Sequence, residues 1–143
     1  MKNSRSLTDL HPYVAKLAVE LKAACALEGV EFIFTQTLRD VEYQNELYAQ
    51  GRTKPGKIVS NARGGYSMHN FGLAFDVVPV DGSKQPVWDA KSPLWARIGQ
   101  IGQSLGLEWG GAWKSFKDLP HFQYVEGLTT AQLRAGQTIK AKP

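Results

Sequence analysis

The sequence predicts a small α+β domain in which a central, mainly antiparallel sheet is flanked by helices. Segments with the three-and-four spacing of apolar residues that is typical of helices alternate with short segments rich in β-branched and aromatic residues. The order of elements is helix, strand, helix, hairpin, helix and strands. This order lacks the regular strand–helix–strand repeat of a parallel sheet, and it favours the α+β class.

The 143 residues fit one compact domain. We expect a single domain over residues 1–143, with a core at about 7–136 and a polar tail at 137–143. The composition, 43% hydrophobic and 21% charged, is ordinary for a soluble globular protein, and no apolar stretch approaches the ~20 residues of a membrane span. The net charge of +4 favours anionic partners without identifying one.

The N-terminal part predicts a strand between two helices. Apolar spacing predicts an amphipathic helix over 10–28, ended by Gly29, and residues 30–37 read as the first strand. Asp40 is the expected cap of a second helix that reaches Gln50. In the first helix, the single cysteine, Cys25, is expected to be a packed core thiol rather than a nucleophile, and His11 is expected to be a surface or capping residue.

A loop over residues 51–65 follows the second helix. It holds four basic residues and no acidic one: Arg52, Lys54, Lys57 and Arg63. Loops of this length in a compact domain are usually functional or mobile. Two interpretations stay open, a solvated loop and a contact with an acidic substrate.

The C-terminal half predicts a hairpin, a helix and further short strands. Asn70-Phe71-Gly72 has the residues of a tight turn that leads into a strand over 73–78, and residues 79–91 form a polar connection. Ser92-Pro93 opens a third helix that Gly106 ends. Residues 107–118 are dense in aromatics and glycines and suit either a groove wall or core packing. A strand over 121–125 and a short helix, capped by Thr129 or Thr130 and ended by Gly136, complete the chain.

His69 and Asp76 flank the predicted turn and are candidate metal ligands. On a straight helix they would be about 10 Å apart along the axis, and on a straight strand about 23 Å apart and on opposite faces. They converge only if the chain reverses between them. His121, in the later strand, is the candidate third ligand, and catalytic zinc keeps three protein ligands and one open position for water. The spacing alone leaves metal binding open.

Two linked motifs resemble those of the zinc peptidases of bacterial cell walls. The first is Ser67-x-His69-x-x-Gly72-x-Ala74-x-Asp76, and the second is Trp109-Gly110-Gly111 followed by Asp118-x-x-His121. This family includes D-Ala-D-Ala carboxypeptidases, L-alanyl-D-glutamate endopeptidases and short phage endolysins. The resemblance covers roughly residues 32–124. One departure is Ala112, where many relatives are expected to carry an acidic residue.

The resemblance implies a Hedgehog/D-Ala-D-Ala-peptidase-like fold and a zinc site. His69, Asp76 and His121 would bind one Zn²⁺, and Asp118 would be the catalytic acid/base. Without the motif, Asp118 would read as a solvated loop carboxylate. A carboxylate that lies near zinc without binding it can accept a proton from water and later deliver one to the leaving amine.

Two further residues are candidates for substrate contact. Arg39 follows the first strand, and its planar cation suits an oxyanion or a substrate carboxylate. The alternative is a surface salt bridge to Asp40 or Glu42. Ser67, by strand alternation, would share a face with His69 and support a ligand or the substrate, and a structural hydrogen bond is the alternative.

The sequence thus favours a zinc metallopeptidase that hydrolyses the L-alanyl-D-glutamate bond of peptidoglycan stem peptides, as a phage endolysin for host cell lysis. A D-alanyl-D-alanine carboxypeptidase or dipeptidase with the same metal site is the first alternative. A non-catalytic, zinc-stabilised wall-binding module is the second. Nucleic-acid binding is not expected, because the basic residues accompany no recognition helix or aromatic platform.

We also expect a monomer without a secretion signal. The first six residues are polar and do not resemble a signal peptide. The expected location is the cytoplasm of the producing, infected cell, followed by action on the cell wall after release.

Overall fold

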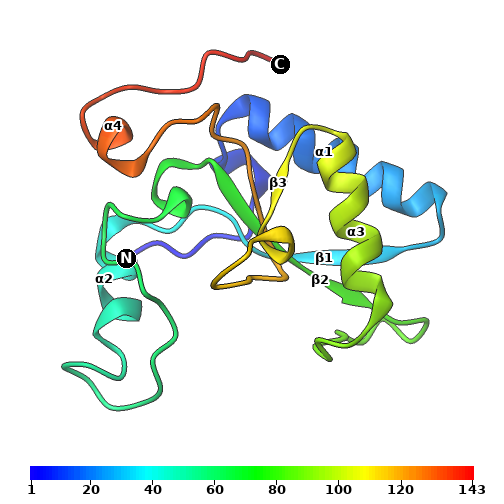
Figure 1. Cartoon of the computed structure of the whole chain (residues 1–143), viewed down its shortest axis with the longest axis horizontal. Coiled ribbons are helices and arrows are strands. Elements are labelled where there is room, and N and C mark those ends of the chain that lie inside the picture. Colours follow the sequence, from blue (N-terminus) through cyan, green and yellow to red (C-terminus); the bar gives the residue numbers. More distant parts are fainter.

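A four-stranded antiparallel sheet lies at the centre of the computed structural model, which describes residues 1–143 (Figure 1). The spatial order of the strands is β1-β2-β4-β3. The antiparallel α+β class predicted from the sequence is confirmed. The strand bounds are β1 (Glu31–Gln36), β2 (Ala74–Val80), β3 (Glu108–Trp109) and β4 (His121–Gln123).

Helices pack over the sheet, and one further helix lies beyond one end of it. The α-helices are α1 (Pro12–Leu27), α2 (Val41–Ala49), α3 (Pro93–Ser104) and α4 (Thr130–Arg134), and the short 3₁₀ helices are η1 (Leu7–Asp9), η2 (Met68–Phe71) and η3 (Gly110–Ala112). Figure 1 shows α1 and α3 side by side at one end of the molecule and α2, with the loop that follows it, at the other. No helix is both long enough and apolar enough to cross a membrane.

The helices begin at the side chains that the sequence predicts as caps. His11 Nδ1 accepts a hydrogen bond from the Tyr13 amide at the start of α1, which confirms the capping role. Asp40, Ser92 and Thr129 accept equivalent bonds at the starts of α2, α3 and α4. A side chain of this kind satisfies an amide that has no partner within the helix, and each contributes about 0.5–2 kcal/mol.

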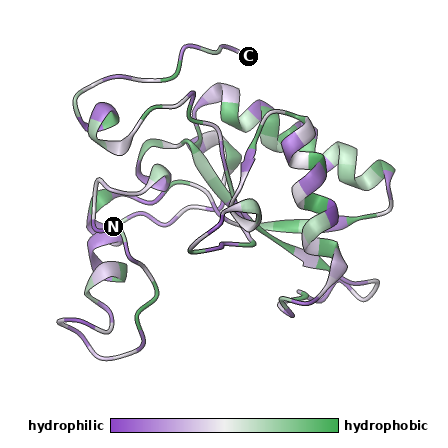
Figure 2. Cartoon of the chain, viewed as in Figure 1, coloured by the Kyte–Doolittle hydropathy of each residue, from purple (hydrophilic) through white to green (hydrophobic).

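The core lies between α1, α3 and the sheet. Three phenylalanines, Phe32, Phe75 and Phe122, are fully buried, and the last two stack with ring centroids 5.7 Å apart. Figure 2 shows hydrophobic residues along β1, β2 and the helices that cover them. Cys25 is also buried in this core, and burial raises the pKa of its thiol to about 11. This confirms the prediction of a packed thiol, because the reactive form of cysteine is the thiolate.

The predicted hairpin between His69 and Asp76 is wrong in form. The chain does reverse at Gly72, which has a left-handed conformation with φ of 69°, but the residues before it form the 3₁₀ helix η2 and not a strand. A Cβ at Gly72 would lie 3.0 Å from the backbone nitrogen of His11, so the close packing of the N-terminal segment adds a second demand for glycine. The partners of β2 are β1 and β4.

The packing of α3 on β3 requires a glycine, and its substitution gives a stability test. A Cβ at Gly99 would lie 2.3 Å from Cδ2 of Trp109. Alanine normally favours a helix over glycine by ~1 kcal/mol. Here we expect Gly99→Ala to lower the free energy of unfolding in urea by about 1–3 kcal/mol, because the indole must move.

The matched control is Gly82→Ala, because a Cβ there meets no atom within 4 Å. We expect its unfolding free energy to stay within about 0.5 kcal/mol of the original. Equal stability of the two variants would contradict the tight contact between α3 and Trp109.

Candidate metal centre

Three side chains that are far apart in the sequence meet at one end of β2. His69 Nε2 lies 3.1 Å from Asp76 Oδ1, and His121 Nδ1 lies 3.4 Å from the same oxygen. One donor atom from each residue lies within 4.8 Å of the donor atoms of the other two. The structure therefore brings together the three residues that the sequence predicts as ligands.

Two features of the backbone produce this convergence. The antiparallel register of β2 and β4 pairs Asp76 directly with His121. Opposite residues in such a pair have Cβ atoms about 4.5–5.5 Å apart and point to the same face. The reversal at Gly72 then returns His69 to that face from η2.

The donors fit a zinc ion in chemistry and in orientation. Two imidazoles and one carboxylate form a set that Zn²⁺ takes in proteins. His69 Nδ1 donates to the backbone carbonyl of Thr37 at 2.8 Å, which leaves the Nε2 lone pair facing Asp76. Burial would raise the pKa of Asp76, but the neighbouring His69 and His121 rings, when they are protonated, hold that pKa below its usual range through their charge and hydrogen bonds. The carboxylate is therefore available as an anionic ligand.

Asp118 lies beside these residues, on the loop between η3 and β4. Its Oδ2 is 3.9 Å from His121 Nδ1, and its side chain is 46% exposed. Burial and the negative charge of Asp76 raise the pKa of Asp118, against the opposing effect of His121. An acid whose pKa is moved toward neutrality suits proton transfer.

The glycine and tryptophan residues of the second motif fix the Asp118 loop. The Asp118 amide donates to the Gly110 carbonyl at 3.0 Å, and a Cβ at Gly110 would lie 2.3 Å from the Asp118 carbonyl oxygen. The Trp109 indole donates to the Leu119 carbonyl at 2.8 Å. This segment therefore combines the two interpretations that the sequence left open, since Trp113 lines the cleft beside the three ligand candidates while Gly110 is buried.

Arg39 faces the site, and the alternative of a surface salt bridge to Asp40 or Glu42 is wrong. Its side chain is only 11% exposed, and Nη2 lies 3.9 Å from Asp76 Oδ2. Nη1 donates to Gln44 Oε1 at 2.9 Å, while Nε is buried without a partner. The guanidinium thus lines the cleft next to Asp76, and contact with substrate stays a prediction.

Ser67 also lines the cleft, but strand alternation does not place it there. It is the cap of η2, and its Oγ accepts a hydrogen bond from the His69 amide at 3.2 Å. Asn70 completes the cap by accepting from the Ser67 amide. The structural hydrogen bond that the sequence offered as the alternative is present, and it holds the backbone of His69.

An open cleft of about 880 Å³ is lined at its base by His69 and His121, the two neighbours of Asp76. Its wall on the loop side is residues 58–62, and the opposite wall includes Trp113, Phe116 and Lys117. Ile58, Val59 and Phe116 are large apolar side chains that remain exposed there. The cleft is therefore apolar at its rim and polar at its base.

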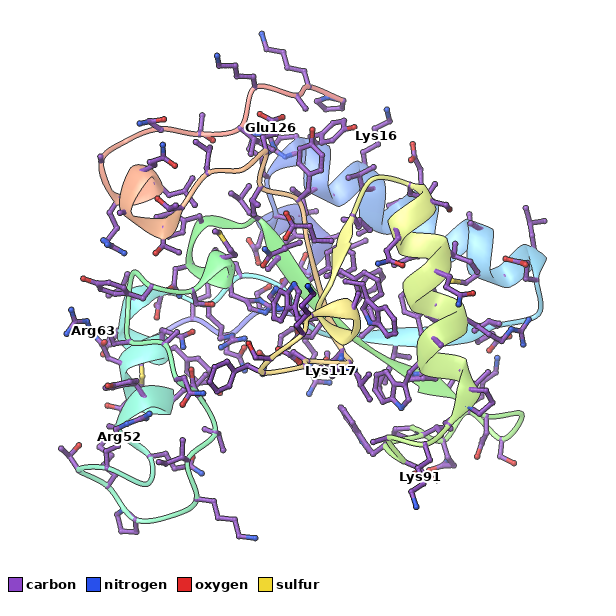
Figure 3. All side chains as sticks on the ribbon, in the orientation of Figure 1. Lys16, Arg52, Arg63, Lys91, Lys117 and Glu126 are labelled. Carbon is purple, nitrogen blue, oxygen red and sulfur yellow. The ribbon has the colours of Figure 1, made fainter.

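The basic residues of the 51–65 loop do not line this cleft, so a contact with an acidic substrate at the site finds no support from them. Arg52 donates to the Tyr48 and Ser60 carbonyls, Lys54 pairs with Glu46, and Arg63 donates to the Tyr66 hydroxyl. Figure 3 shows Arg52 and Arg63 at the outer edge of the molecule, whereas Lys117 lies on the loop before β4. The cation that does line the cleft in addition to Arg39 is Lys117.

Sequence reasoning missed two buried glutamines. Gln44 accepts from Arg39 and donates to Ser60 Oγ and the Ala62 carbonyl, at 3.0 and 2.7 Å. Gln123 contacts His121 Nε2 through Oε1 at 2.7 Å. The only signal for Gln44 was its place in a predicted helix, and Gln123 had none beyond its place two residues after His121.

Comparison with known proteins agrees with this geometry. A family model described as D-alanyl-D-alanine carboxypeptidase matches residues 60–124. The peptidoglycan L-alanyl-D-glutamate endopeptidase CwlK of Bacillus subtilis is 44% identical over 125 residues, which is 82% of this chain and 75% of CwlK. The chain belongs to this peptidase family.

Two other members of the family are similar over most of this chain. An L-alanyl-D-glutamate peptidase of a Listeria phage is 32% identical over 129 residues, 85% of this chain but 41% of the phage protein. The crystal structure of the L-Ala D-Glu endopeptidase ChiX of Serratia marcescens superposes with a TM-score of 0.63 at 30% identity, covering 85% of this chain and 86% of ChiX. The family membership predicted from the two motifs, and its fold, are confirmed.

The ligand assignment gives a test of metal binding. We expect Asp76→Asn to weaken zinc binding by more than about 100-fold. Even groups that only hydrogen-bond to a metal ligand, without touching the metal, contribute about 10–100-fold to metal affinity. The measurement is a competition titration with a chelator of known affinity.

Asp81→Asn is the matched control, since Asp81 is an exposed turn residue whose Oδ1 accepts hydrogen bonds that asparagine can also accept. We expect it to bind zinc as the original protein does. Equal affinities of the two variants would remove Asp76 from the ligand set.

Proposed function

We propose that this protein is a zinc metallopeptidase that hydrolyses the L-alanyl-D-glutamate bond of peptidoglycan stem peptides. The observation that carries the proposal is the convergence of His69, Asp76 and His121, with His69, His121 and Asp118 lining an open cleft. The choice of bond is supported by 44% identity to an enzyme named for it. One zinc ion would be held by the three residues, with Asp118 outside the ligand set.

Each residue of the site has a part in this chemistry. A bound zinc ion supplies a Lewis acid that polarises a peptide carbonyl and lowers the pKa of water toward about 7. Asp118 takes the proton of the attacking water and returns one to the leaving amine, as an acid/base residue with a raised pKa can do at neutral pH. His69 and His121 stay neutral as ligands, and Asp76 supplies the negative charge.

Arg39 is proposed to bind a negative charge of the substrate or of the transition state. Its guanidinium lines the cleft 3.9 Å from Asp76, and only one of its two terminal nitrogens is engaged by Gln44. A planar cation that offers a fork of N–H donors suits an oxyanion or a carboxylate. Lys117 adds a second cation at the cleft, and both suit the free α-carboxyl group of a D-glutamyl residue that is linked through its side chain.

The proposed setting is phage lysis. The similarity to the Listeria phage peptidase supports this setting, although the chain spans less than half of that protein. We propose that the enzyme acts as a monomer, is made in the cytoplasm of the infected cell and reaches peptidoglycan after release.

Ser67 is proposed to support the site through its bond to the His69 amide.

The competing function is a D-alanyl-D-alanine carboxypeptidase, which the description of the matching family model favours. The products distinguish the two. We expect digestion of purified sacculi to give stem peptides that begin with D-glutamate, seen by mass spectrometry of the released fragments, and we expect a chelator to abolish them. Loss of terminal D-alanine with intact L-alanyl-D-glutamate bonds would show the carboxypeptidase instead.

Asp118 separates an enzyme from a binding module with a structural zinc. We expect Asp118→Asn to lower kcat by about 10²–10⁴-fold, because asparagine cannot transfer the proton. Zinc affinity should change by less than tenfold, since Asp118 is not a proposed ligand.

The same Asp81→Asn variant serves as the control for kcat. A protein whose action on sacculi survives Asp118→Asn would not use this carboxylate as its acid/base. A loss of zinc together with activity would instead assign Asp118 to the ligands.

A further inference from the structure

A chain of two hydrogen bonds runs from His121 to the protein surface. His121 Nε2 and Gln123 Oε1 are 2.7 Å apart, and Gln123 Nε2 donates to Glu108 Oε2 at 2.9 Å. The β3–β4 register pairs Glu108 with Gln123, and His121 lies two residues from Gln123 on the same face of β4. His121 and Gln123 are buried, whereas Glu108 is exposed.

The chemistry of the three groups gives this chain a direction. An ionised carboxylate only accepts hydrogen bonds, so Glu108 turns the NH₂ group of the Gln123 amide toward itself. The amide oxygen then faces His121, and an oxygen of this kind also only accepts. His121 must therefore carry a proton on Nε2, and in the neutral ring the lone pair is then on Nδ1, the atom that faces Asp76.

Asp76 favours the other tautomer of His121, with the proton on Nδ1. Its Oδ1 lies 3.4 Å from His121 Nδ1, so a proton on Nδ1 would have an acceptor there. That tautomer has no lone pair to offer a metal on this side of the ring. The hydrogen bond to Gln123 disfavours the tautomer with the proton on Nδ1, but only while the Gln123 amide keeps its oxygen toward His121.

The two histidines are held by different means. His69 Nδ1 donates to the carbonyl of Thr37, and a backbone carbonyl cannot exchange an acceptor for a donor. An amide side chain can do so by rotating half a turn. His121 therefore needs a further group that fixes the amide, and Glu108 occupies that position.

We propose that Glu108 and Gln123 are positioning residues that set the tautomer of His121 and so prepare its Nδ1 lone pair for the metal. Ligating histidines commonly donate their other ring N–H to a partner that fixes ring and tautomer. Here the fixing group is a surface carboxylate on the edge strand β3, acting through one amide. The inference rests on the proposed metal site and adds residues that do not touch the metal.

The test exchanges the side chains of Glu108 and Gln123. Glu108→Gln removes the group that fixes the amide, and we expect zinc affinity, measured by chelator competition, to fall about 10–100-fold. The double variant Glu108→Gln/Gln123→Glu restores a carboxylate next to His121, which accepts from Nε2 directly. We expect this variant to regain most of the lost affinity.

Two controls keep the outcome specific. Glu20→Gln, a change at a half-exposed position of α1 that removes one weak ion pair with Lys16, should leave zinc affinity unchanged. Urea unfolding of the metal-free proteins should show Glu108→Gln to be as stable as the original protein, because Glu108 is exposed. Long-range ¹H–¹⁵N spectra of the metal-free proteins at alkaline pH, where imidazoles are neutral, report the tautomer of His121.

We expect the fraction of His121 protonated on Nε2 to be lower in Glu108→Gln than in the original protein. Unchanged affinity in Glu108→Gln, or a loss that the double variant does not reverse, overturns the proposal and leaves the peptidase function intact. Failure of the original protein to bind zinc overturns the metal site itself, so the two failures are distinct.

Discussion

The pairing of β2 with β4 is the constraint on which the site depends. Its register sets Asp76 opposite His121, and the same ladder stacks Phe75 on Phe122 on the other face, in the core. A shift of one residue would turn Asp76 into the core and an apolar side chain out to the cleft. The buried aromatic pair therefore protects the register of the polar pair, and core packing and site geometry are enforced by the same few backbone hydrogen bonds.

Local sequence signals predicted the elements well, because they act within one turn of the chain. Caps at His11, Asp40, Ser92 and Thr129 and stops at Gly29 and Gly106 need only neighbouring residues. The meeting of His69, Asp76 and His121 was predicted from the resemblance of two motifs, since spacing alone left it open. The form of the reversal before Gly72 was not predicted, because a 3₁₀ turn and a hairpin use the same residues.

Contacts between remote segments were the part that the sequence did not show. Arg39 was expected at the substrate or at neighbouring acids, and its contacts with Asp76 and with Gln44, which joins it to Ser60 and Ala62, were not foreseen. The loop charges were read as a possible surface for an acidic partner, yet three of the four, Arg52, Lys54 and Arg63, bind carbonyls, Glu46 and Tyr66 around the loop itself. Which polar group meets which depends on the folded path of the chain, and composition carries no record of it.

In the 51–65 loop, the groups that anchor the loop are different from the side chains that face the cleft. Gln44, Asn45 and Arg52 fasten it through the Ala62 carbonyl, the Gly64 amide and the Ser60 carbonyl, so its path depends on the backbone rather than on the side chains of Ile58 and Val59. Those two side chains remain exposed. Positions 58 and 59 can therefore be substituted to change the shape and polarity of the cleft wall, while the anchoring bonds and the residues at the base stay as they are.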